Sequence, residues 1–223
     1  MPATGSLEPM KYSCSALLFD NDGVLVDSHQ AAKAAWDVWA KEYSPGYDLD
    51  KANNAGRRAE DMVRELVSAE LFAKANDRIN ELEQETAHLT IAMAGAQELT
   101  ASLKAGIWTV CTSANPNLGR ARLEAAGIVI PKELVTGDDV QRGKPFPDPY
   151  LLGAKNLGFD TQDCVVFEDA DAGVISAIEA GVGLVIGVGK KAVKSDADIV
   201  IKDLTGITFN GEELFIPDSI RLR

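Results

Sequence analysis

The chain has 223 residues, of which 46% are apolar, enough for one domain of ordinary size, a smaller second one and a sizeable core. Lys and Arg total 22 against 34 Asp and Glu, so the formal charge is −12, which argues against nucleic acid or an anionic membrane as a partner. No stretch approaches the roughly 20 apolar residues of a membrane span, and residues 1–10 lack the basic and apolar parts of a signal peptide, so we expect a cytoplasmic protein.

Short apolar runs alternate with helical patterns along the chain, which is typical of a parallel sheet with crossover helices. Five runs are predicted to be strands, with a weaker sixth at the end: residues 14–19, 107–111, 133–135, 164–167, 183–186 and 198–201. Four predicted helices link them: residues 95–104, 116–126, 148–157 and 171–180. The sequence therefore predicts an α/β fold with a Rossmann-like, doubly wound parallel sheet.

One segment interrupts this alternation directly after the first predicted strand. Residues 28–92 show no convincing strand and only helical patterns, at residues 30–42, 58–69 and 71–86. We therefore predict a helical cap domain over residues 28–92, inserted into a catalytic core made of residues 1–27 and 93–223.

Several residue types with chemical potential are expected to be structural. The three cysteines are far apart in sequence and lie in apolar runs, which predicts buried, reduced thiols rather than disulfides or a zinc site. His29 and His88 are expected to be partly exposed on cap helices. Trp36 and Trp39, three residues apart on one helix, are expected to pack inside the cap, with an aromatic wall facing a sugar as the alternative.

Two pairs of acidic residues follow predicted strands. Asp20 and Asp22 flank Asn21 after the first strand, and Glu168 and Asp169 follow the fourth. Ligands of an open parallel sheet bind at the carboxyl ends of its strands, so both pairs are expected at one edge. Either pair alone would more often be a polar loop or a helix cap, but two pairs together favour a cation, and oxygen ligands without His or Cys favour Mg²⁺.

Two further patterns suit an anion at the same edge. Thr112 and Ser113 follow another predicted strand, where hydroxyl and backbone N–H groups can hold a phosphate oxygen. Lys144 lies among three prolines, which restrict the backbone and leave this lysine with little conformational entropy to lose. Taken singly, the hydroxyls would be an ordinary strand end and the lysine a solvated side chain.

These patterns together resemble the four motifs of the haloacid dehalogenase-like phosphatases, in the branch with a helical cap after the first strand. Residues 19–28 (FDNDGVLVDS) match motif one, Thr112 in VCTSA matches motif two, Lys144 in GKPFPD matches motif three, and residues 167–173 (FEDADAG) match motif four. The resemblance covers about residues 13–204. There are two departures: Ala170 stands where many relatives have Ser, and residues 54–57 (NAGR) stand where sugar and polyol phosphatases often have His before Gly.

The resemblance implies a two-step mechanism with Asp20 as nucleophile. Its carboxylate would attack phosphorus to form an aspartyl-phosphate, and it needs no activation because a carboxyl group of pKa ~3.9 is ionised at neutral pH. Asp22 would protonate the departing alcohol and later take a proton from the hydrolytic water.

The resemblance also implies a Mg²⁺ site and a phosphate site. Asp20, the backbone carbonyl of Asp22 and Asp169 would hold the ion, with Glu168 as a ligand or as support. Thr112 and Lys144 would bind phosphate oxygens, with backbone amides that include Ser113 as further donors. The cap would close over this site.

The cap is expected to present the residues that select the substrate. Gly56, Arg57 and Arg58 lie in its most promising loop, although either arginine could instead be a solvated first-turn residue of the following helix.

The predicted function is Mg²⁺-dependent hydrolysis of a small phosphate monoester, such as a sugar or polyol phosphate, by a monomer or weak homodimer. A sugar phosphomutase of the beta-phosphoglucomutase type shares all four motifs and is one alternative. A catalytically idle binding protein that keeps the fold is the other. A haloacid dehalogenase activity is disfavoured, because it requires neither Asp22 nor a metal site.

Overall fold

A computed structural model describes residues 9–52 and 54–223. Most of residues 1–10, for which the sequence predicts no signal peptide, lies outside these ranges. Among the helices described, none is long and apolar enough to cross a membrane.

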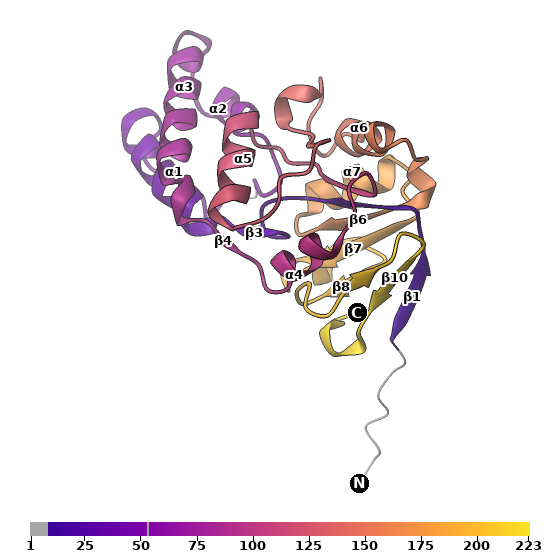
Figure 1. The fold of residues 1–223 in the computed structure, drawn as a ribbon. Coiled ribbons are helices and arrows are strands. Elements are labelled where there is room, and N and C mark those ends of the chain that lie inside the picture. Colours follow the sequence, from indigo (N-terminus) through magenta and orange to yellow (C-terminus); the bar gives the residue numbers. More distant parts are fainter. Residues whose placement is uncertain (1–8, 53) are drawn as a thin grey trace.

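A five-stranded parallel sheet forms the centre of the molecule (Figure 1). The strands run in the order β5-β2-β6-β7-β8, so β2 lies between β5 and β6. Their bounds are Ala16–Phe19 (β2), Trp108–Val110 (β5), Cys164–Glu168 (β6), Leu184–Val188 (β7) and Ile199–Ile201 (β8). Leu18 pairs with Thr109 on one side and Val166 on the other, which fixes the register. The predicted doubly wound parallel sheet is confirmed.

Helices cover both faces of this sheet. The core helices are α4 (Ala96–Ser102), α5 (Pro116–Ala125), α6 (Asp148–Leu157) and α7 (Asp171–Glu179). Leu99 of α4 and Leu123 of α5 pack in one apolar cluster with Phe19, whereas Tyr150 of α6 packs in a second cluster with Leu18. Because successive strand residues point to opposite faces, the continuous apolar runs follow from burial on both sides.

Turn and cap residues set the ends of these helices. The Asn115 side chain accepts a 2.9 Å hydrogen bond from the backbone N–H of Leu118, and Pro116 follows at the first helical position of α5. α6 ends at Gly158, whose φ of +81° suits a residue without a side chain. Short 3₁₀ turns connect other elements: η2 (Gly137–Asp139), η3 (Thr161–Asp163), η4 (Lys191–Lys194) and η5 (Asp218–Ile220).

The structure corrects one predicted strand and shortens another. Residues 133–135 are not a strand: only Val135 bridges, to Cys111, before the chain turns into η2. A single pairing residue cannot form a β-ladder. The fifth strand of the sheet is β8, which corresponds to the weaker sixth predicted strand, residues 198–201. The first predicted strand, residues 14–19, begins only at Ala16.

Two antiparallel sheets were not predicted from the sequence. β1 (Met10–Ser13), β10 (Glu213–Ile216) and β9 (Thr208–Phe209) form a three-stranded sheet that joins both ends of the described chain. β3 (Val26–Asp27) pairs with β4 (Ile91–Ala92), so the two connections to the helical insertion lie side by side. Strands of two to four residues carry too little hydrophobic pattern to be read from sequence.

The cap segment, residues 28–92, is built mainly from α1 (His29–Tyr43), α2 (Ala59–Leu66), α3 (Ala69–Thr86) and the 3₁₀ turn η1 (Ala87–Leu89). Trp36 and Trp39 pack edge to face with ring centroids 5.1 Å apart, and the Trp39 indole N–H donates to the Ala75 carbonyl at 2.8 Å. Both indoles are buried in an apolar cluster of this segment, as expected for packing residues. Trp36 also lines the pocket described below, so the alternative of an aromatic wall facing a sugar stays a prediction. Figure 1 shows α5 of the core beside α1 and α3. The predicted division into cap and core domains stays a prediction.

Candidate active site

Three strands bring the predicted site residues to one edge of the central sheet. Asp20 follows β2, Thr112 comes two residues after β5, and Glu168 ends β6. Because β2 lies between β5 and β6, Asp20 is at the middle of this edge. The backbone N–H of Asp20 donates to the Phe167 carbonyl at 2.9 Å, which ties the two acid-bearing loops together. The predicted convergence of the motifs is therefore observed.

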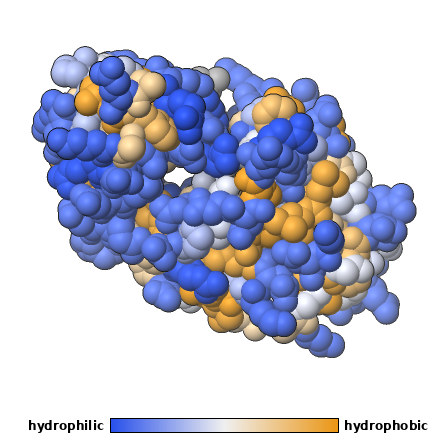
Figure 2. All heavy atoms as spheres, turned by 90° about the horizontal axis from the view of Figure 1, so that it is seen from above, coloured by the Kyte–Doolittle hydropathy of each residue, from blue (hydrophilic) through white to orange (hydrophobic). Residues whose placement is uncertain are grey.

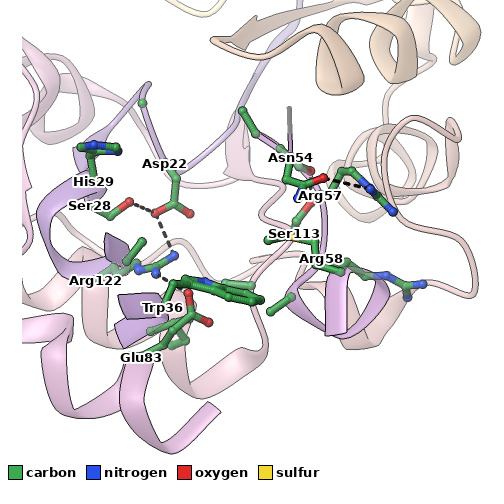
Figure 3. Close-up of a pocket in the computed structure, with 18 of the residues that line it drawn as sticks. Asp22, Ser28, His29, Trp36, Asn54, Arg57, Arg58, Glu83, Ser113 and Arg122 are labelled. Carbon is green, nitrogen blue, oxygen red and sulfur yellow. Dashed lines mark hydrogen bonds and ion pairs between the residues drawn. The ribbon is translucent and has the colours of Figure 1, made fainter. Parts of the chain in front are cut away.

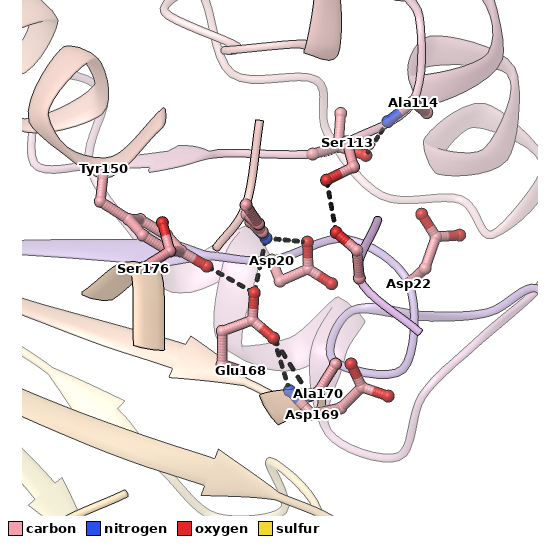
Figure 4. A network of polar contacts seen from close by, with 12 residues as sticks. Asp20, Asp22, Ser113, Ala114, Tyr150, Glu168, Asp169, Ala170 and Ser176 are labelled. Carbon is pink, nitrogen blue, oxygen red and sulfur yellow. Dashed lines mark hydrogen bonds and ion pairs between the residues drawn. The ribbon is translucent and has the colours of Figure 1, made fainter. Parts of the chain in front are cut away.

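A buried lysine bridges two of the acids, Asp20 and Glu168, which Figure 4 shows near each other. The Lys144 ammonium lies 2.6 Å from a carboxylate oxygen of Asp20 and 2.5 Å from one of Glu168. The side chains of Lys144 and Glu168 are 0% exposed and that of Asp20 is 5% exposed. Burial by itself would lower the pKa of Lys144, but the charges and hydrogen bonds of the two carboxylates outweigh burial and raise it. This lysine stays charged.

Glu168 is held by donors on both carboxylate oxygens. Besides Lys144, the Tyr150 hydroxyl donates to Oε1 at 2.7 Å, and the backbone N–H groups of Asp169 and Ala170 donate to Oε2 at 2.9 and 3.2 Å. A buried carboxylate is tolerated only with such partners. These contacts fix the Glu168 carboxylate between Lys144 and the loop that follows β6.

Asp20, Glu168 and Asp169 form an acidic cluster whose ligand atoms lie within 4.8 Å of one another. Gly23 makes room for it, because a Cβ at this position would meet the Asp169 carboxylate. When all three carboxyl groups are ionised, they and the Lys144 ammonium sum to −3 + 1 = −2. Burial, with the neighbouring acids, raises the pKa of Asp20 to about 7 against the opposing effect of Lys144, and raises the pKa of Asp169 well above its usual range. The ordinary carboxyl pKa that the sequence led us to expect for Asp20 is therefore not kept in this site. Because the ionised forms of these buried carboxyl groups are unfavourable without more positive charge, the cluster suits a bound cation that prefers hard oxygen ligands.

Asp22 lies outside this cluster and faces the pocket (Figure 3). Its Oδ1 accepts hydrogen bonds from the Ser28 hydroxyl and, at 3.0 Å, from the Arg122 guanidinium. The side chain of Asp22 is 30% exposed, so substrate and water can reach it. In the sequence, Arg122 is one of several charged residues in a helical pattern, and nothing there distinguishes it as a site residue.

Of the predicted phosphate-binding hydroxyls, Thr112 makes a local contact and Ser113 a long-range one. The Thr112 hydroxyl is buried and accepts from the Ala114 N–H at 3.1 Å. The Ser113 hydroxyl donates to the Gly56 carbonyl at 2.7 Å, which links the core edge directly to the cap loop. Ser113 also lines the pocket.

The three predicted specificity residues, Gly56, Arg57 and Arg58, all line the pocket. Neither guanidinium is free, however: Arg57 pairs with Glu65 at 2.5 Å and Arg58 with Asp61 at 2.8 Å. Helix α2 thus supplies the partner of each arginine.

The pocket between cap and core has a volume of about 1210 Å³. Its cap side carries carboxyl and amide side chains, which include Asp50, Asn54, Asn76, Asn80, Glu81 and Gln84, together with apolar side chains, which include Trp36, Leu49 and Met62. Figure 2 shows a hollow between the mostly hydrophilic surface of the cap and the more apolar surface of the core. Such a lining suits a ligand with many hydroxyl groups.

Comparison with known proteins gives a consistent result. The family model for haloacid dehalogenase-like hydrolases matches residues 14–181. Hexitol phosphatase A of Escherichia coli is 40% identical over 204 residues, which cover 87% of this chain and 94% of that protein. Glycerol-1-phosphate phosphohydrolase 2 of Saccharomyces cerevisiae is 32% identical, with 92% and 88% covered. Beta-phosphoglucomutase of Bacillus subtilis is 29% identical, with 86% and 91% covered.

Solved structures share the fold. A hydrolase from Pseudomonas syringae superimposes with a TM-score of 0.75 at 25% identity, covering 86% of this chain and 94% of its own. CbbY from Rhodobacter sphaeroides in complex with phosphate gives a TM-score of 0.76 at 21% identity, with 89% and 98% covered.

Proposed function

The chain belongs to the haloacid dehalogenase-like hydrolases, and on this basis we propose that it hydrolyses monophosphate esters of sugars or polyols through an aspartyl-phosphate on Asp20. It is a phosphoric monoester hydrolase. One observation above all supports the detailed proposal: Asp20 lies at the centre of the sheet edge, paired with buried Lys144 and next to an acidic cluster.

In the first step an Asp20 carboxylate oxygen attacks phosphorus and the bond from phosphorus to the ester oxygen breaks. Asp22 gives its proton to the departing ester oxygen, so the alcohol leaves neutral. In the second step water attacks phosphorus, Asp22 takes the water proton, and the bond from phosphorus to Asp20 breaks. Phosphate is released, and both carboxyl groups return to their starting state.

The acidic cluster fits Mg²⁺, which the family generally uses. The carboxylates of Asp20 and Asp169 and the backbone carbonyl of Asp22 would hold the ion, while Glu168, whose oxygens already accept four hydrogen bonds, would support them. When bound, Mg²⁺ offsets the repulsion between the anionic nucleophile and the anionic phosphate. Lys144, Thr112 and Ser113 lie at the same edge and would contact the phosphate oxygens.

The cap side of the pocket favours a neutral, hydroxyl-rich substrate body. Arg57 and Arg58 are already paired with acids of α2, so they offer little free charge to a second phosphate or a carboxylate. Amide and carboxyl groups instead suit the donors and acceptors of hydroxyl groups. The names of the E. coli and S. cerevisiae relatives, which act on hexitol and glycerol phosphates, point the same way.

A phosphate-release assay with and without Mg²⁺ tests the proposal. The panel should contain hexitol, hexose and glycerol monophosphates, together with a sugar bisphosphate and a phosphorylated hydroxy acid. We expect turnover of the first group and little of the second, and we expect Asp20→Asn to abolish turnover while the protein remains folded. An Asp20→Asn variant that still releases phosphate would refute the nucleophile assignment.

A sugar phosphomutase is the second candidate, because of the similarity to the B. subtilis mutase. Incubation with a hexose 1-phosphate separates the two reactions. A mutase would convert it to the hexose 6-phosphate, whereas a phosphatase would release inorganic phosphate.

A further inference from the structure

Arg122 joins the proposed acid–base residue to the cap segment. It lies on α5 of the core, and its side chain is only 7% exposed. One guanidinium nitrogen, Nη1, lies 3.0 Å from Oδ1 of Asp22, and the other, Nη2, lies 3.2 Å from a carboxylate oxygen of Glu83 on α3 (Figure 3). These three residues form what we call the cap–core triad.

Glu83 anchors this triad from the cap side. Its side chain is 7% exposed, and Arg122 is its only ion-pair partner among residues 9–52 and 54–223. A buried carboxylate without a compensating charge is costly, so Glu83 and Arg122 hold each other in place. Because Glu83 fixes one end of the guanidinium, the other end has a defined position against Asp22.

The two oxygens of Asp22 are in different environments. The Ser28 hydroxyl and Arg122 both donate to Oδ1, whereas no hydrogen bond reaches Oδ2 within the described parts of the chain. Two donors on one oxygen fix the rotation of the carboxyl group and leave the other oxygen open to the pocket. Proton transfer depends on placement of the acid within hydrogen-bond reach of the reacting oxygen.

We propose that Arg122 is a positioning residue, which Glu83 of the cap holds in place and which orients the carboxyl group of Asp22 for proton transfer. This inference rests on the proposed acid–base role of Asp22. The alternative is that Arg122 only fastens the cap to the core, in which case its loss would affect stability and every substrate alike.

The test compares substrates that do and do not need a general acid. The glycerol oxygen of glycerol 3-phosphate is a poor leaving group unless it is protonated as the bond to phosphorus breaks, whereas the p-nitrophenolate of p-nitrophenyl phosphate leaves without a proton. In Arg122→Gln we expect kcat for glycerol 3-phosphate to fall at least about 10-fold, a part of the roughly 10²–10⁴-fold effect of general acid–base catalysis. KM should stay within about 2-fold, since an orienting residue acts on the chemical step. The initial burst of p-nitrophenol, which reports the first step, should be retained.

Three further variants make the result specific. Arg120→Gln removes an exposed arginine from the same helix and should leave both activities unchanged. Arg122→Lys keeps a charged donor and should recover part of the lost kcat. Asp22→Asn provides the reference loss, and adding Arg122→Gln to it should cost no more than about a further 2-fold, because residues that act through one another are non-additive.

The outcomes separate the inference from the function on which it rests. Two results would overturn the positioning role of Arg122 and leave the acid–base role of Asp22 intact. In the first, Asp22→Asn lowers activity on glycerol 3-phosphate more than on p-nitrophenyl phosphate, but Arg122→Gln does not. In the second, the fold-losses in kcat of the two single variants multiply in the double variant. If Asp22→Asn shows no discrimination, the acid–base role of Asp22 fails and the inference fails with it. Should Arg122→Gln not fold, the pair Glu83→Gln with Arg122→Met removes both buried charges and gives the same comparison.

Discussion

Replacement of Lys144 by methionine tests whether the buried lysine holds the acidic edge together. The variant keeps the length of the side chain and removes its charge from between Asp20 and Glu168. At 2.6 and 2.5 Å, Coulomb's law with an effective dielectric constant of about 20 gives roughly 6–7 kcal/mol for each contact. The desolvation penalty of the ammonium offsets several kcal/mol of this, and broken buried pairs typically cost about 3–5 kcal/mol net.

For a protein of this size, such a loss corresponds to a fall in Tm of roughly 6–20 °C. Differential scanning calorimetry of the Mg²⁺-free protein at pH 7 measures the fall directly. Lys11→Met is the matched control, because Lys11 also pairs with one carboxylate, Glu213 at 2.9 Å, but is 61% exposed. An exposed pair contributes less than about 1 kcal/mol. Equal changes in Tm for the two variants would refute the argument that burial gives Lys144 its importance.

Three other expectations follow from the site and the core. Gly23→Ala should lose stability and Mg²⁺ activation, because the new Cβ would displace the Asp169 carboxylate. Gly106→Ala is its control: Gly106 has a similar φ of +85°, but a Cβ there would meet open space, so this variant should lose only about 1–2 kcal/mol of stability. Burial raises the pKa of Asp20 from 3.8 to about 7, so between these pH values the folded state binds a proton that the unfolded state does not. The Mg²⁺-free protein should therefore lose stability as the pH rises from about 4 to about 7, which thermal melts measure. Mg²⁺ should restore that stability near pH 7. Burial also raises the pKa of all three thiols to about 12, so a thiol reagent at pH 8 should label the native protein more than about 10-fold slower than the unfolded chain.

The core motifs could be predicted because their signals are local. Asp20 and Glu168 each end an uninterrupted apolar run, and a buried parallel strand followed by an acidic residue needs no distant partner to be recognised. The parallel arrangement then brings the two residues to one edge, since β2 pairs directly with β6. The predicted helix at residues 116–126 is α5, whose start is also set by local residues, Asn115 as the cap and Pro116 at the first helical position.

Local sequence patterns did not correctly predict strand pairings that are short or that join segments far apart in the sequence. Residues 133–135 are apolar enough to suggest a strand, but only Val135 reaches the sheet edge before the chain turns. β1 and β10 pair Lys11 with Phe215 across almost the whole chain, and neither segment shows more than weak alternation. Gly56, Arg57 and Arg58 line the pocket, and their role in specificity stays a prediction; the pairing of the two arginines with α2 could be seen only in the fold.

Arg120 and Arg122 illustrate the difference between what can be predicted from the sequence and what depends on the tertiary structure. The sequence determined that both lie on one helix, that Asp20 and Asp22 follow the first core strand, and that the chemistry there suits phosphate transfer. It does not distinguish the two arginines, which have the same side chain in the same helical pattern. Only the packing of α5 against α3 decides that Arg120 is exposed while Arg122 meets Glu83, 39 positions away, and Asp22, 100 positions away. Helical periodicity and strand burial can be recognised from residues that are close in sequence, whereas a buried ion pair depends on which surfaces the folded chain brings together.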